Sequence, residues 1–313
     1  MSLNILITGG TGSLGHELVT QLLSRGGFDD RIIVYSRDEQ KQEAMAAQFN
    51  HDKRLRFFLG DVRDKDRLKL AVRGVDTIIH AAALQIVPAL EYNPMEALKT
   101  NILGTQNLLE AVYETNYPYP TRVIALSTDK AVSPTNLYGA SKLCLEKLVI
   151  AANNVDFGHH SFSVVRYGNV ALSRGSVIPK FVDSVAQGDM IKVTDQRMTR
   201  FWITLKDAAR FVLDRLEDMQ GGEIFIPKMP SFRVQDIAHL MKSPFTYTGI
   251  RPGEKIHETI ISEDEYANAE QRDKYYCIVS GVNSNLTGAL TSANFVMDLG
   301  SLTEKLREVG VVG

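Results

Sequence analysis

Short apolar runs alternate with helix-periodic segments through the first 153 residues of the chain. Each run has four or five residues, a length that suits a buried strand better than a buried helix. Between the runs, apolar residues recur every three or four positions, which is the period of an amphipathic helix. The predicted strands are 4–8, 32–35, 55–59, 77–80 and 122–126, and the predicted helices include 13–25, one starting near Asp64, 94–114 and 137–153.

This alternation predicts an α/β protein with a doubly wound parallel sheet, because parallel strands are joined by crossover helices. Ligands of such sheets bind outside the carboxyl ends of the strands. The pattern continues with a strand at 161–166, a helix ending near Ala186, a strand at 191–193, a helix at 205–219 and a strand at 223–226. We therefore assign 1–169 to a nucleotide-binding domain to which 203–226 returns, and we assign 170–202 and 227–313 to an interleaved substrate lobe. Residues 284–313 carry the weakest signals.

Composition narrows the function classes. Across 313 residues, 35 Lys and Arg balance 37 Asp and Glu, so no basic excess points to nucleic acid or a membrane surface. The two cysteines, Cys144 and Cys277, are too few for a disulfide framework or a zinc cage. We expect reduced thiols, a cytoplasmic protein and no metal. The chain has no apolar stretch of membrane-spanning length and no N-terminal signal peptide, so we also expect no membrane anchor.

A glycine-rich turn follows the first predicted strand and opens the first predicted helix. Glycines in this context let backbone N–H groups and a helix N-terminus approach a pyrophosphate, as in Rossmann-type dinucleotide sites. A purely structural glycine turn is the alternative reading. The candidate cofactor residues in this turn are Gly9, Thr11, Gly12, Ser13, Leu14 and Gly15.

The second predicted strand ends at Ser36 and Arg37, near the place of the ribose-binding acid in an NAD site. A hydroxyl and a guanidinium suit a 2′-phosphate better, so we predict NADP. Asp38 leaves open the alternative that Arg37 is a solvated loop residue. Further cofactor candidates are Lys41, Asp61, Val62, Ala81, Ala82, Ala83 and Asn101.

Two of these cofactor candidates, Asp61 and Asn101, have alternative structural roles, and the nearby His80 is not counted among the catalytic candidates. Asp61 could contact adenine or cap the helix that starts near Asp64. We expect Asn101 to tie strands together through buried side-chain hydrogen bonds. His80 is interpreted as a packed strand residue and not as a catalyst.

The stretch from Ser127 to Lys142 places reactive side chains at the carboxyl end of a predicted strand. Thr128, Asp129 and Lys130 follow the strand directly. After a turn at 133–136, Tyr138 and Lys142 lie four residues apart and share one face of a helix. A hydroxyl, an acid, two amines and a phenol are thus predicted near the cofactor loop. The alternative is an ordinary polar turn and helix.

The ordered strings TGGTGSLG, STDK, YGASK, VRYGNV, SRGSVIP, MTRFWIT and GIRPGEKIHE resemble the extended short-chain dehydrogenases/reductases. Within that group the chain is most similar to the inverting UDP-N-acetylglucosamine 4,6-dehydratases, over about residues 4–260. Retaining dehydratases carry Asp-Glu where this chain has Asp129-Lys130. The chain departs from the pattern at Gln85, where relatives have Lys, and beyond about residue 265.

The resemblance implies a hydro-lyase that recycles NADP. Tyr138 would take the proton of the carbon 4 hydroxyl as that carbon is oxidised, with Thr128 and Lys142 beside it. Lys130 would remove the carbon 5 proton while protonated Asp129 donates to the departing carbon 6 hydroxyl. Hydride return to carbon 6 and protonation of the other face would invert carbon 5. We expect Lys142 to lower the pKa of both Tyr138 and Lys130, and burial to lower that of Lys130 further.

The resemblance also supplies substrate contacts and assembly. It implies a UDP-sugar bound partly through arginines and a homo-oligomer, often a hexamer among relatives. Each contact residue has a structural alternative, and Trp202 is interpreted as a packing residue. The candidate substrate residues are Gln85, Asn169, Arg174, Val177, Thr194, Arg200, Arg251 and Glu254.

Two rival functions remain at this point. A retaining 4,6-dehydratase or a 4-epimerase fits the same fold, but Lys130 argues against the first and Asp129 against the second. A non-catalytic NADP-binding scaffold would not need an acid beside a base.

Overall fold

The computed structural model describes residues 3–25, 27, 30–115, 119–155, 159–173, 175–282 and 284–312. Within these residues, nine strands form one sheet in the order β13-β14-β9-β6-β5-β4-β1-β2-β3. The strands from β3 to β9 pair in parallel, and β14 and β13 are added antiparallel at one edge. The strands are β1 (Asn4–Thr8), β2 (Arg31–Ser36), β3 (Leu55–Leu59), β4 (Thr77–His80), β5 (Arg122–Thr128), β6 (Ser161–Tyr167), β9 (Ile224–Pro227), β13 (Ala269–Gln271) and β14 (Tyr275–Ile278).

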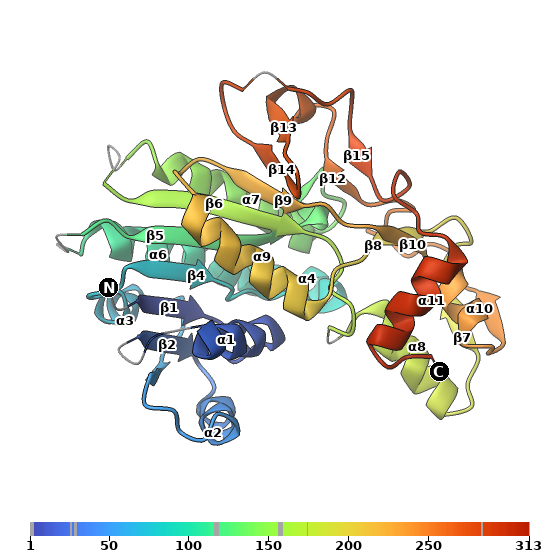
Figure 1. Cartoon of the computed structure of the whole chain (residues 1–313), viewed down its shortest axis with the longest axis horizontal. Coiled ribbons are helices and arrows are strands. Elements are labelled where there is room, and N and C mark those ends of the chain that lie inside the picture. Colours follow the sequence, from blue (N-terminus) through green and yellow to red (C-terminus); the bar gives the residue numbers. More distant parts are fainter. Residues whose placement is uncertain are drawn as a thin grey trace.

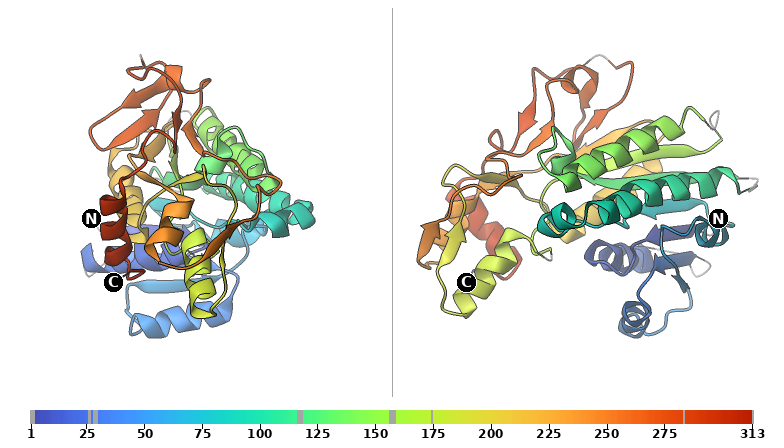
Figure 2. Two further views of the ribbon diagram at one scale, coloured as in Figure 1. Left: turned by 90° about the vertical axis from the view of Figure 1, so that its right-hand side faces the viewer. Right: turned by 180° about the vertical axis from the view of Figure 1, so that it is seen from behind.

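Helices cover both faces of this sheet (Figures 1 and 2). Helices α1 (Ser13–Arg25) and α9 (Leu205–Asp218) pack together on one face, and their leucines and valines enclose an apolar core with β1 and β2. Helices α3 (Lys65–Ala71), α6 (Gly104–Tyr113) and α7 (Leu137–Ala152) enclose a second core on the other face. Helix α2 (Glu39–Gln48) packs against β2 and β3. The predicted doubly wound parallel sheet is confirmed.

The predicted helix at 94–114 is not a uniform α-helix. A separate helix, α4 (Val87–Tyr92), precedes the predicted range. The first turn of that range is helix α5 (Pro94–Ala97). A π-helical segment, Leu98–Leu103, then leads into α6. Such segments widen a helix locally and are frequent at functional sites. Here the segment carries the buried Asn101.

A smaller lobe lies beyond the carboxyl ends of the parallel strands, on the right-hand side of Figure 1. It has its own apolar core, in which Phe181, Trp202, Phe232 and Leu302 are buried. Two short pairs, β7–β11 and β8–β10, form its sheets, and a third pair, β12–β15, lies above it. The elements are α8 (Val177–Ala186), β7 (Ile191–Val193), β8 (Thr199–Phe201), β10 (Ser231–Arg233), α10 (Val234–Leu240), β11 (Phe245–Tyr247), β12 (Thr259–Ile261), β15 (Leu290–Thr291) and α11 (Leu299–Glu308).

One part of the predicted domain division is wrong. Strand β14 pairs antiparallel with β9, and β13 pairs with β14, so 269–278 extends the main sheet. We expected this stretch to belong to the lobe, as part of 227–313. Hydrogen bonding to the free edge of β9 determines its place, and sequence periodicity does not report that partner.

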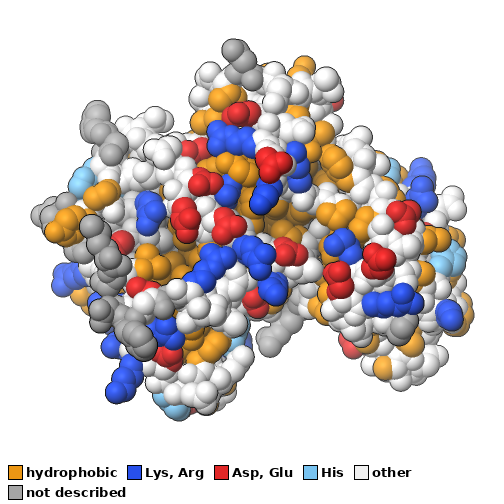
Figure 3. Space-filling model, viewed as in Figure 1, with side chains coloured by type: hydrophobic (Ala, Val, Ile, Leu, Met, Phe, Trp, Pro, Cys, Tyr) orange, Lys and Arg blue, Asp and Glu red, His pale blue; other side chains and the backbone are white. Residues whose placement is uncertain are grey.

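The surface agrees with the balanced composition. On the face shown in Figure 3, basic and acidic side chains are interspersed. No helix in the described part of the chain combines the length and the apolar character needed to cross a membrane.

Candidate active site

The carboxyl end of β5 delivers the first reactive side chains. Strand β5 ends at Thr128, and a single 3-10 turn, Asp129–Ala131, follows at once. The hydroxyl of Thr128 accepts from the backbone N–H of Lys130 at 3.4 Å and so caps this turn. Asp129 is thereby fixed inside the protein with no exposed surface, and the side chain of Lys130 is about one-quarter exposed.

Helix α7 brings Tyr138 and Lys142 to the same place. Asn136 caps the helix by accepting from the N–H of Gly139 at 2.9 Å. A Cβ at Gly139 would overlap the carbonyl oxygen of Lys130, so only glycine lets the helix lie this close to the 3-10 turn. The string YGASK therefore does more than supply Tyr and Lys, because its glycine sets the distance between the two halves of the site.

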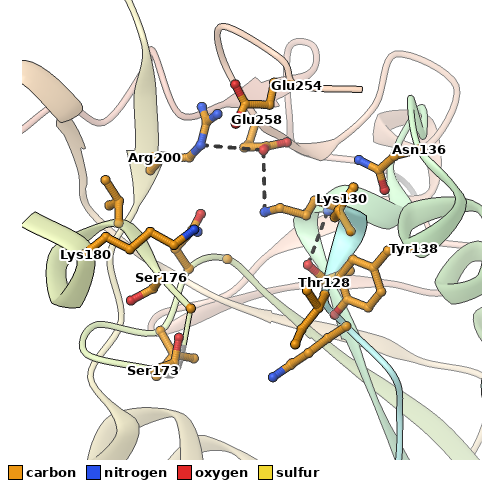
Figure 4. Close-up of a pocket in the computed structure, with 18 of the residues that line it drawn as sticks. Thr128, Lys130, Asn136, Tyr138, Ser173, Ser176, Lys180, Arg200, Glu254 and Glu258 are labelled. Atoms are coloured by element: carbon orange, nitrogen blue, oxygen red, sulfur yellow. Dashed lines mark hydrogen bonds and ion pairs between the residues drawn. The ribbon is translucent and has the colours of Figure 1, made fainter. Parts of the chain in front are cut away.

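A cluster of four charged side chains lies between the carboxyl end of β5 and the lobe, and Figure 4 shows three of them, Lys130, Arg200 and Glu258. Lys130 Nζ donates to Asp129 Oδ1 at 3.0 Å and lies 3.5 Å from Glu258 Oε1. Arg200, on β8, places Nε 3.7 Å from the same Glu258 oxygen. We call these residues the open cluster, because Asp129 Oδ2 and Glu258 Oε2 are buried without a hydrogen-bond partner in the described structure. Buried carboxylate oxygens in this state are energetically unfavourable and point to chemistry.

The surroundings set the protonation of this cluster. Burial raises the pKa of Asp129, and the neighbouring carboxylate of Glu258 raises it further. Burial opposes the charge on Lys130, but the carboxylates of Asp129 and Glu258 outweigh it and raise the pKa of the amine. The expectation of a lowered Lys130 pKa is therefore wrong for the protein itself. The cation that acts against Lys130 is Arg200 and not Lys142.

Tyr138 and Lys142 also differ from expectation. Burial raises the pKa of Tyr138 to about 12, and the cation that opposes this shift is Lys130. Burial lowers the pKa of Lys142 to about 8, against the pull of Glu146. Lys142 Nζ donates to the carbonyl of Leu126 at 2.7 Å. The causes that shift the Tyr138 pKa are thus burial, Lys130, Asp129 and Thr128, and Lys142 is not among them.

The predicted glycine turn and these side chains line one cavity of about 1370 Å³. That volume suits two nucleotide-sized ligands. The turn contributes glycines whose closest neighbours are backbone atoms, and Gly9 has a φ of +66°, which favours glycine. A dinucleotide therefore fits the residues present. The predicted cofactor residues that line the cavity are Gly9, Gly12, Ser13, Leu14, Gly15, Ala81, Ala82, Ala83, Tyr138 and Lys142.

Other predicted cofactor residues lie outside the cavity lining. Ser36 is buried, and its hydroxyl accepts from Gln42 at 3.0 Å. Arg37 is more than half exposed and lies 3.8 Å from Asp61. The helix after β3 is capped by Asp64 and not by Asp61, which excludes that alternative for Asp61. Three more lie outside the lining. Thr11 belongs to the glycine turn, Lys41 pairs with Asp38, and Val62 packs on Gly104.

Asn101 and His80 are structural in the protein itself. The Asn101 amide oxygen accepts from the backbone N–H of Leu84, and its amide nitrogen donates to the Leu84 carbonyl. The same nitrogen also donates to the Ser141 hydroxyl at 2.9 Å. Asn101 thereby joins the segment after β4 to helix α7, so the expected side-chain hydrogen bonds are present but they do not tie two strands together. His80 is buried between the hydroxyls of Thr8 and Thr105, which confirms that it is a packed strand residue.

All but one of the predicted substrate residues line the same cavity, some from the sheet domain and the others from the lobe. Arg200 is nearly buried, and Asn169 Oδ1 is buried without a partner in the described structure. Trp202 does not line the cavity but packs edge-on against Phe232, which confirms the packing interpretation. Arg174 lies outside the described residues. The members that line the cavity are Gln85, Asn169, Val177, Thr194, Arg200, Arg251 and Glu254.

Glu258 and Lys255 are among the cavity residues that were missed from the sequence. Glu258 is 3% exposed and belongs to the open cluster. Lys255 is half-buried and donates to the carbonyl of Val132 at 2.6 Å. Both belong to GEKIHE, the string quoted for the resemblance. The signal was therefore present in the motif, but nothing local distinguishes these charges from solvated ones.

Comparisons with known proteins agree with this geometry. The sequence profile of the polysaccharide biosynthesis protein family matches residues 5–280. A curated UDP-N-acetylglucosamine 4,6-dehydratase (inverting) of Campylobacter jejuni is 51% identical over 279 residues, which cover 88% of this chain and 82% of that protein. A UDP-glucose 4-epimerase of Rickettsia conorii is 42% identical over 283 residues, with the same two coverages.

Solved structures extend the likeness to the whole fold. The X-ray structure of Pen from Bacillus thuringiensis has a TM-score of 0.92 and 32% identity, and the match covers 99% of this chain and 98% of that one. The dTDP-glucose 4,6-dehydratase DesIV of Streptomyces venezuelae, solved with NAD and TYD bound, has a TM-score of 0.71 and 25% identity. That match covers 80% of this chain and 86% of DesIV.

Proposed function

This chain belongs to the polysaccharide biosynthesis protein family, and from that premise we propose that it is an inverting UDP-N-acetylglucosamine 4,6-dehydratase. The reaction is a hydro-lyase reaction that makes a 4-keto-6-deoxy sugar nucleotide with inverted carbon 5. The 51% identity to the Campylobacter enzyme supports the assignment. The observation that carries it is Lys130, which lines a cavity of nucleotide size together with Tyr138 and donates to the buried Asp129.

The residues divide the oxidation at carbon 4 among them. A bound nicotinamide would supply a hydride acceptor for carbon 4 and then a hydride donor for carbon 6. Tyr138 takes the hydroxyl proton of carbon 4, and the Thr128 hydroxyl and the charge of Lys130 both favour its phenolate form. Lys142, fixed by the Leu126 carbonyl, binds the cofactor ribose.

Elimination needs a base and an acid at neighbouring carbons. A Lys130 ammonium beside an Asp129 carboxylate holds as many protons as a neutral Lys130 beside a protonated Asp129. One proton transfer across their 3.0 Å contact converts the first state into the second. Neutral Lys130 then removes the carbon 5 proton, and Asp129 gives its proton to the carbon 6 hydroxyl, which leaves as water. Protonation of carbon 5 from the opposite face inverts it.

NADP is the cofactor that we propose. Arg37 is exposed at the end of β2, and its guanidinium suits a 2′-phosphate. DesIV was solved with NAD, so the nicotinamide class is supported by the neighbours and the phosphate preference by Arg37 alone.

Substrate binding and assembly complete the proposal. We propose that Arg200 and Arg251 bind the UDP pyrophosphate, that Asn169 binds the sugar or a phosphate, and that Glu254 binds the uridine ribose. All four line the cavity. We also propose a homo-oligomer in the cytoplasm.

A 4-epimerase is the second candidate, favoured by the 42% identity to the Rickettsia protein. Incubation with UDP-N-acetylglucosamine, followed by NMR and mass spectrometry of the product, separates the two. The dehydratase gives a product lighter by one water, with a new methyl group and inverted carbon 5. A product of unchanged mass that differs only at carbon 4 would establish the epimerase, and a retained carbon 5 would exclude inversion. Nucleotide extracted from the same protein is expected to be NADP, and NAD alone would contradict the role of Arg37.

A further inference from the structure

Glu258 is held in place by segments that are far apart in sequence. It precedes β12 directly and is almost fully buried. Its backbone N–H donates to Ser292 Oγ at 3.0 Å, and its carbonyl accepts from the Ser292 N–H at 2.8 Å. Thr199, on β8, bonds the same serine hydroxyl at 2.6 Å. Such anchoring leaves the carboxylate little freedom to move away from the cavity.

The two oxygens of the Glu258 carboxylate have different surroundings. Oε1 faces Lys130 at 3.5 Å and Arg200 at 3.7 Å, and Oε2 has no partner in the described structure. Figure 4 shows the Lys130 side chain reaching from the sheet domain toward Glu258, which lies across the cavity beside Arg200. A residue whose only task was to join the two parts would use both oxygens, because an unpartnered buried oxygen lowers stability.

Lys130 has one persistent negative neighbour. The charged and titratable groups that interact with it are Asp129, Glu258, Arg200, Lys255 and Tyr138. Asp129 must carry a proton before elimination, so it is then neutral. Arg200 and Lys255 repel the charge on Lys130, and burial keeps Tyr138 in its phenol form. Glu258 is thus the anion that can stabilise positive charge on Lys130 while the carbon 5 proton moves.

We propose that Glu258 is a positioning residue of the dehydration step, which holds the Lys130 amine at the cavity wall and stabilises the ammonium that Lys130 becomes on taking the carbon 5 proton. The proposal rests on the proposed function for its role in turnover. Its electrostatic part concerns the protein alone. Removal of the negative charge must make Lys130 easier to deprotonate, so the neutral amine must persist at lower pH.

The test measures the Lys130 amine directly in the purified protein. Trace acetylation with acetic anhydride over a range of pH, read by peptide mass spectrometry against the exposed Lys53, reports the neutral fraction of Lys130. In Glu258→Gln the pH at which Lys130 becomes reactive is expected to fall by about 1 unit or more. With UDP-N-acetylglucosamine, kcat is expected to fall about 10- to 100-fold with KM little changed, since the interaction is strongest in the transition state.

Two further variants keep the result interpretable. Glu265→Gln removes a carboxylate that pairs with Arg166 away from the cavity, and it is expected to leave Lys130 reactivity unchanged. Glu258→Asp keeps the negative charge but moves it farther from Lys130, because the side chain is one methylene shorter. The pH at which Lys130 becomes reactive is then expected to fall by less than in Glu258→Gln, and this variant gives a result even if Glu258→Gln does not fold. The buried Cys277 provides the folding control for each variant. Its thiol is expected to stay unreactive toward a thiol reagent as long as the chain is folded.

The outcomes are separable. Unchanged Lys130 reactivity in folded Glu258→Gln or Glu258→Asp protein would overturn the inference, and so would an equal shift in Glu265→Gln. A wild-type protein that forms no dehydrated product would instead overturn the proposed function, and the acetylation result would stand without it.

Discussion

Two clusters of buried charge can be compared within this molecule. In the closed cluster, the guanidinium of Arg166 on β6 lies between Glu146 of α7 and Glu265, and the Arg166 side chain has no exposed surface. In the open cluster, Lys130 lies between Asp129 and Glu258, with Arg200 beyond. Both clusters place one cation between two carboxylates, and both join the sheet domain to the segment that follows residue 257.

The clusters differ in how completely their hydrogen bonds are made. Arg166 makes five hydrogen bonds, two to each carboxylate and one to the carbonyl of Ile260. The open cluster leaves one oxygen on Asp129 and one on Glu258 without a partner in the described structure. The closed cluster does not line the cavity, whereas all but Asp129 of the open cluster do.

The difference separates structural charge from reactive charge. A guanidinium whose N–H groups are all bonded cannot exchange protons and fixes the geometry of its surroundings. An amine held by one short and one longer contact, beside carboxylates with free lone pairs, can gain and lose a proton with little rearrangement. Burial alone therefore does not separate these two clusters, and what distinguishes the reactive one is incomplete bonding at the wall of the cavity.

The sharpest way to break the comparison is to remove the acid of the open cluster. Asp129→Asn keeps the shape but cannot donate a proton to the leaving hydroxyl, so kcat for dehydration is expected to fall about 10²- to 10⁴-fold. Thermal unfolding is expected at the same temperature or higher, because a neutral amide replaces a buried carboxyl group whose pKa burial raises. Turnover within tenfold of wild type would show that Asp129 is not the acid.

A smaller effect, on stability, is expected from the closed cluster. Arg166→Met leaves Glu146 and Glu265 buried beside an apolar side chain, and the free energy of unfolding is expected to fall by about 3–5 kcal/mol. Denaturant unfolding measures this loss, and the kcat of the protein that remains folded is expected to stay near that of wild type. Unchanged stability with a collapsed kcat would reverse the roles that we assign to the two clusters.

The sequence predicted the cofactor side of the site better than the lobe side. Gly9, Asp129, Lys130, Tyr138 and Lys142 lie within local patterns of a strand, a turn and a helix, and the order of parallel strands brings those patterns to one edge. Their mutual distances follow from short-range geometry, such as the contact of Gly139 with the Lys130 carbonyl. This part of the chemistry is encoded in residues close together in the chain.

The lobe side depends on contacts between distant segments. Glu258 reaches Lys130 across 128 residues, and its anchor Ser292 belongs to the region with the weakest sequence signals. Burial then changes the chemistry, since the two carboxylates raise the Lys130 pKa that sequence reasoning expected to be lowered. Arg166 was likewise read only as the end of a strand, and nothing local reveals that Glu146 and Glu265 surround it.

The most direct test of the account follows the carbon 5 proton. Wild-type protein and Lys130→Ala are incubated with UDP-N-acetylglucosamine in deuterated water, and the sugar is followed by NMR. The account predicts about one deuterium per turnover at carbon 5 of an inverted 4-keto-6-deoxy product for the wild type, and no label or product for Lys130→Ala. Deuterium at carbon 5 at an unchanged rate in Lys130→Ala would contradict the assignment of Lys130 as the base.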